Sequence, residues 1–352
     1  MRFFVGGYSR TLHCAELNSD SGAMSIQSSV DTGSNASFLA WAPETSTVYA
    51  TAETGTHPAE PGSIAAFRLH DTGRLTRMSD ALSCGAGPCH VAVDASKRLL
   101  VAANYVGGSI VALSLTETGD IGTPLACIQH EGQGPNAARQ ERAHAHSTHF
   151  DPARAAVYVC DLGTDEVVRY PLSVLDAGAD RAAGTGALAL RPGAGPRHLA
   201  FSPDGRHAYV VTELSNTVLA CSHDPVTGAL TVLQESSLLP DGYESEALAA
   251  EIQLHPNGAL VYVSVRGPDR ICVFRRETAT GRLEPCASFS SGGVWPRHFD
   301  IDESGRYMLV ANERSNLVCS FRIDPESGMG TSTGCTLEVE APSCTLFAGG
   351  KS

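Results

Sequence analysis

A short hairpin motif that recurs six times constrains the fold of this chain more than any other feature. In its clearest copy, residues 195–213, an apolar strand leads into a Ser-Pro-Asp-Gly turn, and a second strand alternates into Tyr209 and Val211. Turns of this kind recur at intervals of 47 to 57 residues, centred on positions 43, 95, 152, 203, 256 and 303. A period of about 50 residues, with two clear strands per unit and room for two more, predicts four-stranded propeller blades.

Strands from the two chain ends supply a seventh blade. Apolar segments lie at residues 2–5 and 11–17, and another lies at residues 344–348. Joined in one sheet, these segments close the ring and remove its exposed edges. We therefore predict an all-β, seven-bladed β-propeller, closed by N- and C-terminal strands that share the last blade. The propeller is expected to form one domain over residues 1–352.

Charge and composition exclude several classes of partner. The formal net charge of −13 is opposite in sign to that of nucleic-acid binders, so no nucleic acid is expected. The sequence has no apolar run of the roughly 18 residues that span a membrane and no secretion signal, so we expect no membrane contact and a cytoplasmic protein. The 11 cysteines lie mostly in apolar strands without a CxxC pair, which favours reduced thiols over disulfides. The oligomeric state is left open.

The repeat predicts which residues meet at one end of the central channel, here called the mouth. The first strand of each blade lines the channel, so residues just before it and just after the second strand meet there. Arg197 and Glu213 are therefore expected to be neighbours. These positions hold varied residue types instead of one repeated type. The first set is Ser37, Cys89, His146, Arg197, Ala250 and Arg297, and the second is Glu53, Tyr105, Leu162, Glu213, Arg266 and Glu313.

This mixture predicts a site for an anionic ligand that is hydrolysed or cyclised. Arg197, Arg266 and Arg297 can hold carboxylate or phosphate oxygens. His146 and Glu213 can move protons or position water. The alternative is that these side chains simply pair with one another in solvent. A long polar insertion that ends at His146, residues 131–146, is of the kind that more often carries function than not.

The histidines near this insertion do not predict a metal site. His144, His146 and His149 have the spacing HxHxxH, but in an extended segment His149 falls on the opposite face from the other two. No acidic cluster completes a set of ligands. We expect neither a metal nor a cofactor.

Five short motifs at or near the mouth positions together resemble one family. They are Arg139-Gln140-Glu141 with His144-Ala145-His146-Ser147, Gly195-Pro196-Arg197-His198, Thr212-Glu213-Leu214, Val265-Arg266 and Trp295-Pro296-Arg297. Over essentially its full length the sequence is similar to the seven-bladed propeller lactonases, which include the bacterial 6-phosphogluconolactonase of the propeller type and the fungal 3-carboxy-cis,cis-muconate cyclase. The resemblance implies an active-site group of His146, Arg197, Glu213 and Arg266 that works without a metal. Register and adjacency add Arg297, His198 and Tyr105 as residues expected to bind substrate.

The expected function is hydrolysis of an anionic lactone, first of all 6-phosphogluconolactone to 6-phosphogluconate in the pentose phosphate pathway. Arginines would stabilise the oxyanion that forms when water attacks. His146 and Glu213 would serve as base and acid, in an order that the sequence leaves open. Three alternatives remain, namely muconate cyclisation, hydrolysis of another sugar lactone, and a propeller scaffold that binds proteins. Three arginines at one mouth favour the phosphorylated lactone.

Overall fold

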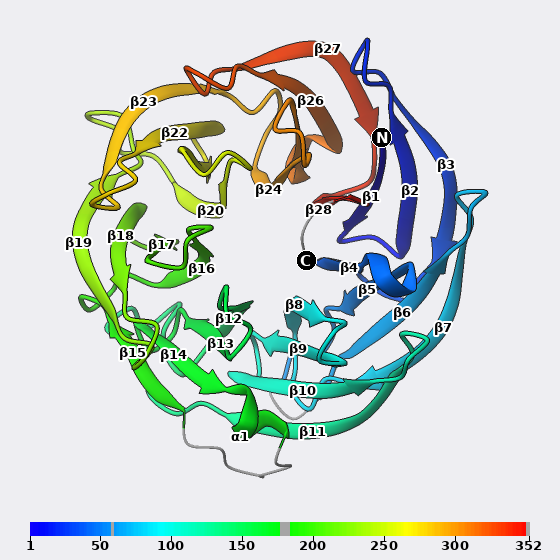
Figure 1. Cartoon of the computed structure of the whole chain (residues 1–352), viewed down its shortest axis with the longest axis horizontal. Helices are drawn as coiled ribbons and strands as arrows, with labels where there is room; N and C mark the ends of the chain where they lie inside the picture. Colours follow the sequence, from blue (N-terminus) through cyan, green and yellow to red (C-terminus); the bar gives the residue numbers. More distant parts are fainter. Residues whose placement is uncertain (58–59, 177–183, 350–352) are drawn as a thin grey trace.

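The computed structural model describes residues 1–57, 60–176 and 184–349, in which seven four-stranded antiparallel sheets surround a central channel (Figure 1). This is the seven-bladed β-propeller that the repeat predicted. Six blades use consecutive strands, with the first strand innermost. The first three are β4 (Leu39–Ala42), β5 (Thr47–Ala52), β6 (Ser63–Leu69), β7 (Leu75–Leu82); β8 (Pro88–Asp94), β9 (Leu99–Asn104), β10 (Ser109–Leu115), β11 (Ile121–Gln129); and β12 (Ala145–Phe150), β13 (Ala156–Asp161), β14 (Glu166–Pro171), β15 (Thr185–Ala189).

The next three blades follow the same order. They are β16 (Pro196–Phe201), β17 (His207–Thr212), β18 (Thr217–His223), β19 (Leu230–Ser237); β20 (Leu248–Leu254), β21 (Leu260–Arg266), β22 (Arg270–Arg276), β23 (Leu283–Ser290); and β24 (Pro296–Ile301), β25 (Tyr307–Asn312), β26 (Leu317–Ile323), β27 (Gly330–Glu338). Short helices in the described residues are η1 (Pro43–Thr45), α1 (Leu172–Asp176) and η2 (Glu313–Ser315). None of these helices is long and apolar enough to cross a membrane.

The two chain ends share the last blade, as predicted. Its order is β28 (Pro342–Phe347), β1 (Arg2–Gly7), β2 (Thr11–Leu17) and β3 (Met24–Asp31), so the C-terminal strand is innermost. Phe3 pairs with Phe347 across β1 and β28, and both side chains are buried. The ring is thus closed by main-chain hydrogen bonds and by apolar packing between its ends.

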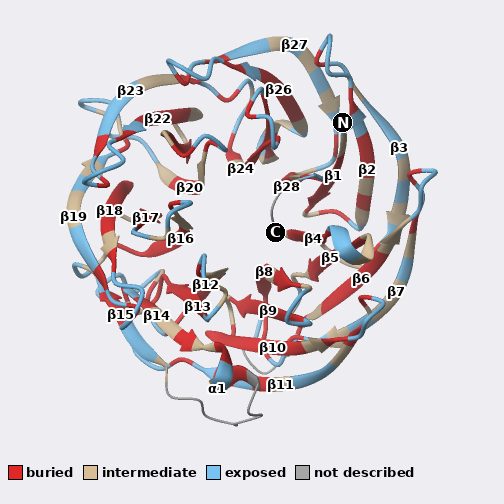
Figure 2. Cartoon of the chain, viewed as in Figure 1, coloured by how far each residue is buried: buried red, intermediate tan, exposed pale blue. Residues whose placement is uncertain are grey.

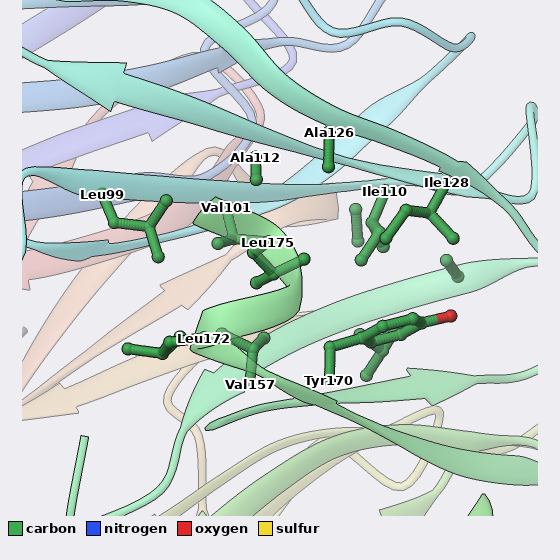
Figure 3. Packing of buried hydrophobic residues seen from close by; sticks show 13 residues of the cluster. Leu99, Val101, Ile110, Ala112, Ala126, Ile128, Val157, Tyr170, Leu172 and Leu175 are labelled. Atoms are coloured by element: carbon green, nitrogen blue, oxygen red, sulfur yellow. The ribbon is translucent and has the colours of Figure 1, made fainter. Parts of the chain in front are cut away.

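Burial follows the distance of each strand from the channel (Figure 2). β9, with the apolar sequence Leu-Leu-Val-Ala-Ala-Asn, is buried along its whole length, whereas the outer strand β3 is mostly exposed. Strands covered on both faces read as continuous apolar runs, which explains why the second strand of each blade was easy to recognise. Between the blades of β8–β11 and β12–β15, Val101 and Ile110 pack with Val157 and Leu175 (Figure 3).

A repeated tyrosine links neighbouring blades. Four tyrosines at equivalent positions in the second strand each donate a hydrogen bond of 2.8 to 3.1 Å to a glycine carbonyl in an outer turn of the next blade. These bonds fix how each blade sits against its neighbour. The donors are Tyr49, Tyr158, Tyr209 and Tyr262, and the acceptors, in the same order, are Gly119, Gly228, Gly281 and Gly328.

The prediction of reduced cysteines is wrong for one pair. Cys84 and Cys127 form a disulfide, with Cα atoms 6.0 Å apart. Cys84 precedes β8 and Cys127 lies in β11, the outer strand of the same blade. The cysteines on which the prediction rested lie instead in the apolar strands β13, β18, β22 and β26. Cys160 and Cys221 are buried free thiols, as expected.

Candidate active site

A β-bulge near the start of the inner strand sets the direction of one mouth residue in several blades. Between β16 and β17, Pro196 pairs with Thr212 and His198 pairs with Val211, so Arg197 has no partner across the ladder. An extra residue of this kind bends the strand and re-aims a side chain, and such bulges are common beside active sites. The mouth positions found from the repeat coincide with these bulges, which recur at Cys89, His146 and Arg297.

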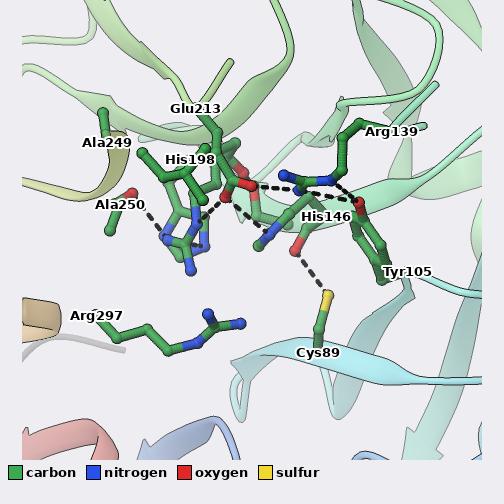
Figure 4. Close-up of polar contacts among 12 residues, drawn as sticks. Cys89, Tyr105, Arg139, His146, His198, Glu213, Ala249, Ala250 and Arg297 are labelled. Atoms are coloured by element: carbon green, nitrogen blue, oxygen red, sulfur yellow. Dashed lines mark hydrogen bonds and ion pairs between the residues drawn. The ribbon is translucent and has the colours of Figure 1, made fainter. Parts of the chain in front are cut away.

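Glu213 is the centre of the site, because three arginines bind its carboxylate. Arg266 Nη2 donates to Oε2 at 2.7 Å and Arg197 Nε donates to the same oxygen at 3.1 Å, which confirms the predicted neighbours Arg197 and Glu213. Arg139 Nη2 donates to Oε1 (Figure 4). Glu213 is only 3% exposed. Burial alone raises the pKa of its carboxyl, but the charges of Arg266, Arg197 and Arg139 outweigh it and hold the pKa well below its usual value.

Main-chain carbonyls of β20 fix the two buried arginines. Arg197 Nη1 donates to Ala250 O at 2.8 Å, and Arg266 donates to Leu248 O and Ala249 O, each at 3.1 Å. Within the described residues, no hydrogen bond uses Nη2 of Arg197 or Nη1 of Arg266. Each guanidinium therefore has one nitrogen without a hydrogen bond in the described structure. Three cations around one carboxylate also leave the site with an excess of positive charge.

His146 lies beside this group as a neutral imidazole. Its Nε2 is 3.8 Å from Glu213 Oε2, and its buried Nδ1 has no hydrogen-bond partner in the described structure. Burial, followed by the charge of Arg197, lowers the pKa of His146 well below its usual value, although Glu213 opposes this shift. A neutral imidazole always carries one nitrogen that can accept a proton. The geometry thus provides a base inside a cationic site.

The opposite side of the mouth has a different charge balance. Arg297 extends toward the Glu213 group in Figure 4, but its Nη1 lies 3.7 Å from Glu313 Oε2 and its guanidinium lies over the ring of Tyr8 at 5.0 Å. Burial raises the pKa of the nearby Glu53 carboxyl, and Arg297 partly offsets this effect. Arg297 reaches the mouth as predicted, with two carboxylates of its own nearby.

The other two residues predicted to bind substrate lie at different depths. The Tyr105 hydroxyl accepts a hydrogen bond from Arg139 Nη2 at 3.2 Å, so Tyr105 belongs to the Glu213 group. His198, by contrast, is 1% exposed and lies below the mouth between Arg197 and Glu251. Contact between His198 and substrate stays a prediction, and the burial of His198 favours a role in supporting Arg197.

Arg139 is the functional candidate to which the sequence had assigned no role. It lies in the long insertion, and its side chain is 33% exposed, more than those of the other two arginines on Glu213. The next residue, Gln140, is fully buried and donates to Leu162 O and to Asp165 Oδ1, each at 2.8 Å. This anchor holds the insertion over the site. The motif containing Arg139 and Gln140 was the available signal, but the repeat gave it no register.

The histidines of the HxHxxH segment have separate partners. His144 contacts Tyr105 O at 2.8 Å and Glu141 at 3.1 Å, whereas His149 contacts Ser147 Oγ at 2.8 Å. The part of the chain that the structure describes has no group of three or more His, Cys, Asp or Glu side chains placed to hold a metal ion.

Known proteins share both the sequence pattern and the fold. The family model described as a lactonase with a seven-bladed β-propeller matches residues 2–347. The chain is 35% identical over 289 residues to the 6-phosphogluconolactonase of Bacillus subtilis, covering 81% of this chain and 80% of that protein. It is 32% identical over 339 residues to the 6-phosphogluconolactonase of Formosa agariphila, covering 92% and 93% of the two chains.

Solved structures extend the comparison to the whole fold. The periplasmic gluconolactonase of Pseudomonas aeruginosa superposes with a TM-score of 0.89 at 29% identity, over 98% of each chain. A putative 6-phosphogluconolactonase of Bacteroides fragilis superposes with a TM-score of 0.88 at 26% identity, over 98% of this chain and 97% of that one.

Proposed function

This chain belongs to the lactonase family of seven-bladed β-propellers, and on that premise we propose that it hydrolyses 6-phosphogluconolactone to 6-phosphogluconate. One observation carries the proposal, namely that three arginines converge on the buried carboxylate of Glu213 next to the neutral His146. The names of the relatives from Bacillus subtilis and Formosa agariphila support the phosphorylated substrate.

The arginines bind the lactone carbonyl oxygen and stabilise its developing charge. The nitrogens that the protein leaves unused, Nη2 of Arg197 and Nη1 of Arg266, donate hydrogen bonds to this oxygen. As water adds to the carbonyl carbon, negative charge accumulates on the oxygen, and preorganised cations in a buried site stabilise that charge most effectively. Because Glu213 holds both guanidinium groups in place, they need no rearrangement during the reaction.

His146 moves the proton. It takes a proton from the attacking water as the new C–O bond forms, and the resulting imidazolium returns a proton to the ring oxygen as the ring C–O bond breaks. The products are a carboxylic acid, which ionises, and a free hydroxyl group. Glu213 is too acidic to donate a proton at neutral pH, and at 3.8 Å its charge stabilises the imidazolium. We therefore assign both the base and the acid role to His146.

The remaining positive charge binds the phosphate. Arg139 is partly exposed at the edge of the site, and Arg297 extends from the opposite side. Arginine is well suited to phosphate because its planar guanidinium presents paired donors. Such a substrate places the reaction in the pentose phosphate pathway and, we propose, in the cytoplasm.

The likeness to the periplasmic gluconolactonase supports a second candidate substrate, unphosphorylated gluconolactone. The two candidates are distinguished by measuring hydrolysis of both lactones, corrected for the spontaneous rate. We expect the phosphate to raise kcat/KM at least about 10-fold, as a charge-assisted pair of roughly 1.4 kcal/mol would. Equal values for the two lactones would favour gluconolactone.

The role of His146 is tested in the same assay. We expect His146→Gln to lower kcat by about 100-fold or more, the usual contribution of a general base. His13→Gln is the matched control, because His13 lies in β2 and contacts Ser29 at 2.8 Å. A His146→Gln variant as active as the control would remove His146 from the mechanism.

A further inference from the structure

Directly below the mouth, the inner strands carry a layer of buried histidines and one glutamate. Each member follows a mouth residue in the chain, and together they are called the histidine layer: His90, His198, Glu251 and His298, with the half-buried ring of Phe38 packed against the three histidines. The rings of His90 and His198 lie 5.1 Å apart, and those of Phe38 and His298 lie 5.3 Å apart. Neither the fold nor the reaction described above requires a buried carboxylate at this depth.

Hydrogen bonds connect this layer to the reaction site. Arg197 Nη1 lies 3.1 Å from His198 Nε2, and His198 Nδ1 lies 2.9 Å from Glu251 Oε2. His298 Nε2 approaches the same Glu251 oxygen at 3.4 Å. All of these side chains are buried.

The chemistry of arginine fixes the direction of this chain of bonds. A guanidinium group only donates, so His198 Nε2 accepts the hydrogen bond from Arg197 and its proton resides on Nδ1. The Nδ1–H then donates to Glu251. A carboxylate in this position selects the histidine tautomer that can receive Arg197, as second partners of functional histidines commonly do.

We propose that Glu251 is a positioning residue, which through His198 holds Arg197 in the orientation that stabilises the reacting oxyanion. The inference rests on the proposed lactone hydrolysis. Arg197 then has Nε on Glu213, Nη1 on His198 and Ala250, and Nη2 directed to the ligand. Without the acceptor on His198, one of these restraints is lost, and Arg197 can rotate away from the carbonyl oxygen.

The hydrogen-bonded chain of Glu251, His198 and Arg197, here called the relay, depends on pH because of the surroundings of Glu251. The groups that face it are Arg197 and His198 from β16, His298 and Asp300 from β24, and Cys344 from β28. Burial raises the pKa of Glu251 to about 8, and Arg197 opposes the shift. A protonated Glu251 donates to His198 Nδ1 and drives the proton of His198 to Nε2, where it meets the N–H of Arg197. We therefore expect kcat to rise as the pH passes through about 8.

A double-mutant cycle tests the relay. At pH 9, where Glu251 is ionised, we expect Glu251→Gln to lower kcat on 6-phosphogluconolactone about 10-fold and to leave KM within about 2-fold, because one charge-assisted bond is lost. The variant should also lack the rise in kcat near pH 8. In an Arg197→Ala background, the same substitution should change kcat by less than about 2-fold, since coupled residues are not additive. Asp94→Asn, which alters a buried carboxylate at the end of β8 that accepts a hydrogen bond from Ser96, is the control and should retain wild-type kcat.

Equal effects of Glu251→Gln in both backgrounds would overturn the proposal, because a general loss of folding does not depend on Arg197. A second readout is independent of activity, namely the tautomer of His198 from its ring ¹⁵N chemical shifts, assigned by comparison with a His198→Gln spectrum. The proposal requires the Nδ1–H tautomer at pH 9 and its loss at pH 6, where Glu251 is protonated. Finding the Nε2–H tautomer in the wild type at pH 9 would overturn the relay, whereas the Nδ1–H tautomer in a protein without lactonase activity would support the relay and contradict the proposed function.

Discussion

Arg139 and Glu213 are joined by an ion pair at the channel mouth although 74 residues separate them in the chain. Arg139 comes from the irregular insertion and Glu213 follows the second strand of a different blade. The insertion is therefore part of the site, and its buried Gln140 is the anchor that makes this possible.

Replacing Arg139 should impair the reaction without unfolding the protein. We expect Arg139→Gln to reduce kcat/KM for 6-phosphogluconolactone by about 10- to 100-fold, as the loss of a charge-assisted pair predicts. Arg142→Gln is a matched control, because Arg142 lies on the same insertion, is half exposed and pairs with Glu141. If both variants have the same kcat/KM, Arg139 has no specific role, and the insertion contributes only through its net charge.

The tyrosines between blades should contribute measurably to stability. Tyr49→Phe removes the buried bond to Gly119 O and leaves that carbonyl without its donor, so we expect the free energy of unfolding to fall by about 1 to 3 kcal/mol. Tyr243→Phe removes an exposed bond to Glu246 O and should cost less than about 0.5 kcal/mol. Denaturant unfolding of both variants measures the difference, and equal losses would show that the bond between blades has no special weight.

Asp300 should make the protein less stable at alkaline pH. Its carboxyl accepts bonds from the main chain of Ile301 and Phe347, and burial raises its pKa to about 7. Because the folded-state pKa lies above the ordinary value, the stabilising contribution is present at low pH and is lost as the pH rises through 7. We expect the free energy of unfolding to fall less between pH 5.5 and 8.5 in Asp300→Asn than in the wild type. An identical fall in both proteins would contradict this assignment.

The fall of kcat/KM at low pH should reflect protonation of His146. Its pKa is held well below the usual value, so its base form persists at neutral pH and is lost only as the pH falls through that lowered pKa. The measurement is kcat/KM against pH in the Glu251→Gln variant, in which the limb near pH 8 should be absent. We expect an apparent pKa well below 6.5. An acid limb centred at or above 6.5 would show that another group is the base.

Much of this molecule could be predicted because a propeller repeats its geometry. The turn at Ser202 and its equivalents set the blade number, and the apolar ends of the chain predicted the closing blade. The same register predicted that Arg197 and Glu213 would meet. Bulges at His146 and Arg297 explain why these two residues also reach the mouth.

Features outside the repeat could not be found in this way. Arg139 reaches Glu213 from an irregular loop that has no equivalent position in other blades. The disulfide between Cys84 and Cys127 depends on how two segments of one blade meet in space. Glu251 has a role only because His198 lies between it and Arg197, a relation that spacing along the chain does not reveal.

The most direct test of the account is the hydrolysis of 6-phosphogluconolactone by Glu213→Gln, corrected for the spontaneous rate. An amide cannot hold three guanidinium groups, so we predict that kcat/KM falls at least about 100-fold, comparable to the loss of preorganised oxyanion stabilisation. Glu235→Gln, which alters an exposed partner of Arg191, is the control, and circular dichroism checks that each variant is folded. If Glu213→Gln unfolds, Glu213→Asp takes its place, with a smaller predicted loss. A folded Glu213 variant that retains the activity of the control would contradict the central claim.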